Sequence, residues 1–239
     1  MASGHSTRES IGEPASQRHR TLLVGTVLAA TVTFLVSGAL VIVADPPPSD
    51  APVLGVLAHG LWALSVSLLA VGVLSAVWVL PALRRRLSGV LSVGALGLGV
   101  VVGIQWLTWA YVDVRAAEQA DYELALATVI TPFGAGHVLM YAILLGAGIA
   151  WFAWALVAAT VVGRVTGSVG VVVGVLTAAV AAVSLLAALE GGGDGHWLYN
   201  VATILLPVCY LWAGFVAVQL YRDWESAVQR GWDSIGDVG

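Results

Sequence analysis

The stretch that decides the fold is residues 53–80, VLGVLAHGLWALSVSLLAVGVLSAVWVL, which contains no Asp, Glu, Lys or Arg. A helix needs about 20 apolar residues to cross the hydrocarbon core of a bilayer, and this stretch exceeds that length. Pro81 and the arginines Arg84, Arg85 and Arg86 follow it and end the apolar run. The pattern predicts a transmembrane helix that stops at a positively charged turn.

Five other runs meet the same test, so we expect an all-α, polytopic membrane bundle of six transmembrane helices. The predicted spans are Thr21–Ala44, Val53–Leu80, Leu87–Val112, Gly136–Val162, Ser168–Leu189 and Leu198–Tyr221. Of the 239 residues, 59% are hydrophobic and only 10% are charged, and a soluble domain could not bury so much apolar surface. We therefore divide the chain into a disordered tail (1–20), a transmembrane domain (21–222) and a C-terminal tail (223–239).

The arginines predict the orientation of these spans. The chain has no lysine, and nine of its ten arginines lie before the first span, in the 84–86 turn, at Arg164 or after the sixth span. Those segments share one side when six spans are threaded, whereas the other side carries only Arg115 among several acidic residues. By the positive-inside rule, we expect both termini in the cytoplasm and the protein in the cell membrane.

Three histidines are expected at one membrane depth, at the outer start of the second, fourth and sixth spans. They are His59, His137 and His196, and aromatic residues follow them closely at Trp62, Tyr141 and Tyr199. Neutral imidazole is a common axial ligand of haem iron and also binds copper. We expect these histidines to be cofactor ligands, with Trp62 and Tyr141 as walls of a haem site. The alternative is that each histidine lies at the interface and hydrogen-bonds to water or a loop carbonyl.

These residues resemble the N-terminal half of subunit I of the haem–copper oxygen reductases, in particular the B-type members. The second span begins Ala58-His59-Gly60 and is closed by Leu80-Pro81-Ala82. In the family a histidine at this place is an axial ligand of the low-spin haem, and a similar turn closes the helix. The resemblance therefore implies that His59 binds haem iron.

The fourth and sixth spans extend this resemblance. Residues 131–137, TPFGAGH, with Tyr141 are similar to the approach to the family's fourth span, whose Gly-His is not a metal ligand. The sixth span opens Gly195-His196, where the family has a Gly-His-Pro string whose histidine binds copper. The resemblance thus makes His59 and His196 the candidate metal ligands. Here Trp197 replaces that proline, so we expect haem rather than copper. The family's other ligands lie in later spans, which implies that this chain is not a complete oxygen reductase by itself.

Several classes of function are disfavoured by what the sequence lacks. It contains no phosphate-binding loop, catalytic triad order or nucleic-acid-binding patch, and we assign no catalytic residue. The absence of lysine excludes a Schiff-base cofactor, and the single Cys209 excludes a cysteine metal site. The centres of the spans hold no ionisable residue, with Gln105 and Tyr210 among the few polar exceptions, which disfavours a transporter.

Two hypotheses from different classes are favoured, and a transporter stays as a less favoured alternative. The first is a haem-binding membrane protein of a respiratory chain, and the second is a cofactor-free structural or assembly subunit of a membrane complex. The first predicts an external electron-transfer protein or another membrane subunit as a partner, besides the lipid bilayer. The second predicts a partner that packs on helix faces rich in glycine and alanine.

Overall fold

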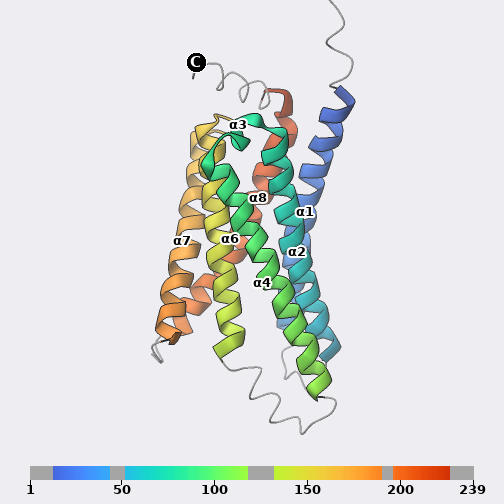
Figure 1. Ribbon diagram of the computed structural model, residues 1–239, viewed down its shortest axis with the longest axis vertical. Coiled ribbons are helices and arrows are strands. Elements are labelled where there is room, and N and C mark those ends of the chain that lie inside the picture. The colour runs from blue at the N-terminus through green and yellow to red at the C-terminus, as the bar shows by residue number, and fades with distance from the viewer. Residues whose placement is uncertain (1–12, 44–51, 118–131, 190–195, 227–239) are drawn as a thin grey trace, which may run out of the picture.

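The computed structural model describes residues 13–43, 52–117, 132–189 and 196–226, and all its regular elements are helices (Figure 1). They are α1 (Glu13–Val43), α2 (Pro52–Val79), the short α3 (Pro81–Arg84), α4 (Leu87–Ala117), α6 (Pro132–Ala158), α7 (Arg164–Leu189) and α8 (His196–Arg222). Six of them are long and apolar enough to cross a membrane, which confirms the predicted all-α bundle. Exposed leucines, valines and tryptophans cover its flanks, as expected for a surface that faces lipid.

Most of the long helices extend, at one end or both, beyond the apolar runs from which they were predicted. α1 already starts at Glu13, within the tail predicted to be disordered, whereas residues 1–12 and the C-terminal tail from residue 227 lie outside the described part. Helices α2, α3 and α6 each begin on a proline, which tolerates the first helical position because its missing N–H has no partner there. Hydropathy thus locates the spans, but polar residues and prolines set the helix ends.

The α6–α7 connection lies four residues earlier than predicted, because α6 ends at Ala158 and not at Val162, and α7 begins at Arg164 and not at Ser168. The N–H of Val161 donates to the carbonyl of Leu156, and the N–H of Thr160 donates to that of Val157. This pair of bonds is a Schellman motif, and it requires the left-handed conformation that Thr160 adopts (φ 54°). The motif ends α6 and reverses the chain into α7.

The six long helices form a closed ring in chain order. Each helix packs against the next one, α8 returns to α1, and α6 also reaches across the ring to α8. As a result α6 is the most buried span, with 61% of its residues inside, and α7 is the least buried, with 28%. The core of the bundle therefore lies around α6.

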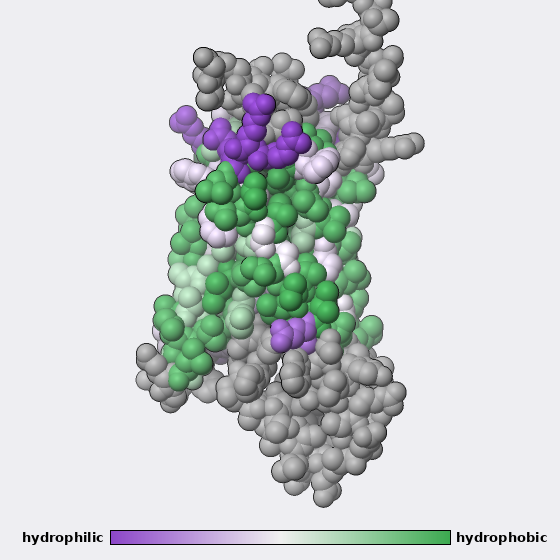
Figure 2. Space-filling view, in the orientation of Figure 1, coloured by the Kyte–Doolittle hydropathy of each residue, from purple (hydrophilic) through white to green (hydrophobic). Residues whose placement is uncertain are grey.

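The two ends of the bundle differ in chemistry. The start of α1, the α3 turn and the end of α8 lie at one end, which we call the arginine end because it carries Arg84, Arg85, Arg86 and Arg164 (Figure 1). Hydrophilic residues gather there above a hydrophobic flank (Figure 2). The opposite end, which we call the histidine end, carries the backbones of His59, His137 and His196. In Figure 1, α1, α2 and α4 spread away from α6, α7 and α8 toward the histidine end.

Candidate functional site

The two aromatic residues predicted to line the site lie inside the bundle and touch each other. Trp62 on α2 is 7% exposed and Tyr141 on α6 is fully buried. Their rings meet edge to face, with centroids 4.4 Å apart and an angle of 72° between the planes. This geometry suits the quadrupoles of the two rings. Trp62 and Tyr141 therefore join α2 to α6 rather than standing on opposite sides of a slot.

Two of the three predicted histidines, His59 and His137, lie on α2 and α6, the helices that meet at this contact. The backbone of His59 precedes Trp62 by three residues, and that of His137 precedes Tyr141 by four, which is one helical turn in each case. Residues at these spacings share one face of a helix. His196 is the first residue of α8. The side chains of all three histidines lie outside the described part of the structure.

Tyr210 on α8 completes the centre of the site, although we expected no role for it. Its hydroxyl lies 2.5 Å from the Tyr141 hydroxyl and 3.1 Å from Ser65 Oγ on α2. The Tyr210 ring stacks on Phe34 of α1, with centroids 4.2 Å apart. The only sequence signal was that Tyr210 is a rare polar group at the middle of a span; its partners are distant in the chain.

The protons of this hydroxyl chain can be assigned in one direction. Ser65 Oγ donates to the carbonyl of Trp62 at 2.7 Å, one turn earlier on α2. Tyr210 then donates to Ser65, and Tyr141 donates to Tyr210, so that every hydroxyl proton has an acceptor. The three hydroxyl groups therefore need no further acceptor for their protons. Neighbouring hydrogen bonds in such a buried chain also polarise and strengthen one another.

The remaining helices close around this cluster. On α4, a methyl group at Gly99 would lie 3.7 Å from the Tyr141 ring, and one at Gly103 would lie 3.5 Å from Trp62. On α7, Thr177 Oγ1 lies 3.3 Å from the buried Cys209 Sγ, which is the neighbour of Tyr210. Four helices, α1, α2, α6 and α8, supply the aromatic cluster, which we define as Phe34, Trp62, Ser65, Tyr141 and Tyr210. Helices α4 and α7 pack around it.

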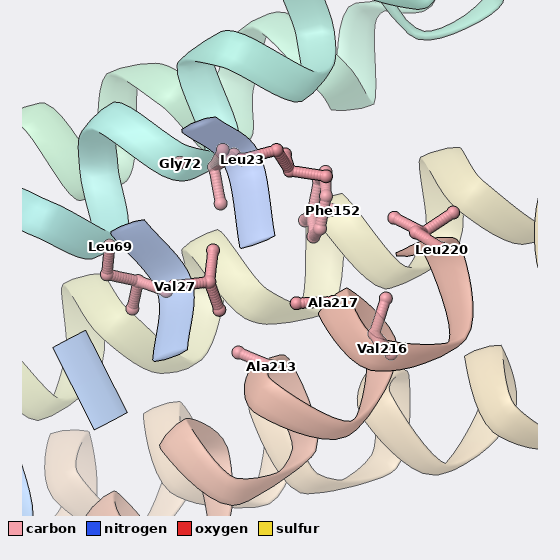
Figure 3. A pocket seen from close by; sticks show the side chains of 10 residues that line it. Leu23, Val27, Leu69, Gly72, Phe152, Ala213, Val216, Ala217 and Leu220 are labelled. Carbon is pink, nitrogen blue, oxygen red and sulfur yellow. The ribbon is translucent and has the colours of Figure 1, made fainter. Parts of the chain in front are cut away.

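A small internal cavity lies between the aromatic cluster and the arginine end. Apolar side chains of α1, α2, α6 and α8, among them Leu23, Leu69, Phe152 and Val216, point into it (Figure 3). Its volume is about 10 Å³, which is the space that a single water-sized probe needs. A cavity of this size is too small to hold a porphyrin.

Metal binding by carboxylates or cysteine has no support in the part of the chain that the structure describes. No three His, Cys, Asp or Glu side chains gather there. The side chains of the predicted ligands His59, His137 and His196 lie outside the described part, so this statement does not cover them.

Comparison with known proteins finds no matching family model, no matching curated sequence and no matching solved structure.

Proposed function

We propose that this chain is a haem-binding membrane protein of an electron-transfer chain, similar to part of subunit I of the haem–copper oxygen reductases. The observation that carries the proposal is the contact between Trp62 and Tyr141. It brings α2 and α6 together one helical turn closer to the arginine end than the backbones of His59 and His137. These two histidines are the proposed axial ligands of the haem iron.

The ring contact changes the role that the aromatic residues would have. Because the rings of Trp62 and Tyr141 touch, a porphyrin does not fit between them. The two rings would instead pack against the side of the porphyrin that faces the arginine end. The haem would supply one-electron chemistry, and the buried rings would exclude water from its inner edge. His196 lies many turns from Tyr210 along α8 and is the weaker candidate ligand.

The histidine end would then be the place of electron exchange. An external electron-transfer protein, or another membrane subunit that presents a cofactor, could approach the haem edge there. By the positive-inside rule this end lies outside the cytoplasm, so an external donor would reach it without crossing the membrane.

A second candidate function is that of a cofactor-free structural or assembly subunit. The observation in its favour is that the hydroxyl groups of the aromatic cluster satisfy one another's hydrogen bonds. In this case the histidine end has no prosthetic group, and the chain acts through its helix surfaces.

One spectroscopic experiment separates the two functions. The full chain is expressed with haem supplied and purified in mild detergent, and its visible spectrum is recorded in oxidised and reduced states. We expect a Soret band that His59→Ala and His137→Ala each weaken or shift, whereas His19→Ala, near the start of α1, leaves it unchanged. A folded protein without a Soret band, or one with a band that neither substitution alters, would contradict haem binding and favour the structural subunit.

A further inference from the structure

An open groove lies on the lipid-facing surface at the arginine end. It runs between α4 and α7 across α6 and has a volume of about 420 Å³. Its walls are Leu87 and Leu91 of α4, Trp151 and Trp154 of α6, and Val171 and Val175 of α7. Trp154 is 58% exposed, Val175 is 52% exposed and Leu87 is 73% exposed. A large apolar surface is thus open to the bilayer beside a charged end.

Exposed arginines flank both walls of the groove. On one side, Arg84 and Arg85 are exposed in the turn that leads into Leu87. On the other side, Arg164 is exposed at the start of α7, seven residues before Val171 and therefore on the same helix face. Arg86 is already engaged, because its guanidinium donates to the carbonyl of Ala158 at the end of α6. The three remaining guanidinium groups can meet a ligand.

We propose that this groove is a binding site for an anionic phospholipid. The acyl chain packs in the groove against Trp151 and Trp154, where only apolar side chains face it. The phosphate is held by the guanidinium groups of Arg84, Arg85 and Arg164, because arginine presents a planar fork of donors that matches phosphate oxygens. Ser88, at the polar end of the groove, supplies a hydroxyl for the ester or glycerol oxygens.

Charge selects the anionic lipid over the alternatives. A zwitterionic lipid offers the same acyl chain but no net charge to the arginines, and each basic residue near the membrane surface strengthens binding to an anionic lipid about fivefold. A helix of a partner protein would fill the apolar part of the groove but would give the arginines nothing to bind unless it carried acidic residues. The site lies at the opposite end of the bundle from the proposed haem and is independent of it.

Tryptophan quenching by brominated lipid tests the proposal. The purified full chain is placed in phosphatidylcholine nanodiscs, and brominated phosphatidylglycerol is compared with brominated phosphatidylcholine at equal mole fractions. We expect stronger quenching by the anionic lipid, and we expect this excess to disappear in the Trp151→Phe/Trp154→Phe double variant. An excess that survives without these two tryptophans would overturn the proposal, because the preferred lipid would then lie elsewhere.

Charge and groove variants separate a site from diffuse attraction. Arg85→Gln should weaken the preference for phosphatidylglycerol about fivefold, and adding Arg164→Gln should weaken it further. Arg222→Gln removes one charge at the same end, on α8 and outside the groove, and should leave the preference unchanged. Val171→Phe, which fills the groove and leaves the arginines intact, should abolish the excess quenching. An equal effect of Arg222→Gln, or an undiminished preference with Val171→Phe in folded protein, would refute the site.

Discussion

At the scale of single residues, the aromatic cluster explains why two tyrosines stand where phenylalanine would fit a membrane interior. A buried hydroxyl without a partner is costly, yet both Tyr141 and Tyr210 are fully buried. Each is tolerated because the other supplies its hydrogen bond, and Ser65 accepts the last proton. The hydroxyls therefore specify which faces of α2, α6 and α8 meet.

This arrangement predicts an order for two substitutions. Tyr210→Phe deprives the Tyr141 hydroxyl of its partner and should lower the free energy of unfolding by about 1–3 kcal/mol. Tyr141→Phe leaves Tyr210 bonded to Ser65 and should cost about 1 kcal/mol or less. Thermal unfolding in detergent micelles measures both, and Tyr221→Phe, at a 45% exposed position, is the control. A larger loss for Tyr141→Phe than for Tyr210→Phe would contradict the assigned direction of the hydroxyl chain.

At the scale of helices, small residues and single hydrogen bonds set the spacing. A methyl group on Gly146 of α6 would lie 2.6 Å from the carbonyl oxygen of Gly174, and one on Gly174 would lie 2.5 Å from the carbonyl oxygen of Gly146. Backbones this close make many van der Waals contacts with each other, and such contacts drive helix association in lipid. Hydrogen bonds from Ser37 to the carbonyl of Ala58 (2.6 Å) and from Ser92 to that of Gly148 (2.9 Å) join other neighbouring helices.

The α6–α7 contact predicts a sharp difference between two glycines. Gly146→Ala would force α6 and α7 apart and should destabilise the fold by about 1–3 kcal/mol. Gly97→Ala on α4 is the matched control, because nothing lies within 4 Å of the added methyl group. It should be neutral or stabilising by up to about 1 kcal/mol, since alanine has the higher helix propensity. Thermal melts that rank the two variants equally would show that the close approach contributes little.

At the scale of the whole molecule, an even number of long helices brings the start of α1 and the end of α8 to the arginine end (Figure 1). The arginines of α3 and α7 lie at that same end, whereas all three predicted histidine ligands occur at the other. This asymmetry separates the proposed lipid site from the proposed haem site by the length of the bundle. It also makes the orientation testable.

Cysteine labelling of intact cells tests the orientation. In a Cys209→Ala background, Trp197→Cys at the histidine end should react with a membrane-impermeant maleimide added outside. Arg85→Cys at the arginine end should react only after the cells are permeabilised, because the positive-inside rule places it in the cytoplasm. Both positions are exposed, so burial does not limit the reaction, whereas Cys209 is buried. The reverse labelling pattern would refute the predicted topology.

The number of spans, their approximate positions and the even count of crossings could all be predicted from the sequence. Each follows from the free-energy cost of placing polar groups in hydrocarbon, and this cost depends on the identity of each residue along the sequence. The ends of the helices were harder to predict. Helix α1 begins at Glu13, in a polar stretch before the apolar run, and the end of α6 depends on the left-handed conformation of Thr160.

The sequence by itself determined a six-helix membrane bundle with histidines near the start of every second span. Only the tertiary structure decided that Trp62 touches Tyr141, that Tyr210 joins them, and that exposed arginines flank a groove between α4 and α7. The physical reason is that hydropathy records how deep a residue lies in the membrane. Which helix faces meet depends instead on close packing of glycines and on hydrogen bonds between residues far apart in the chain.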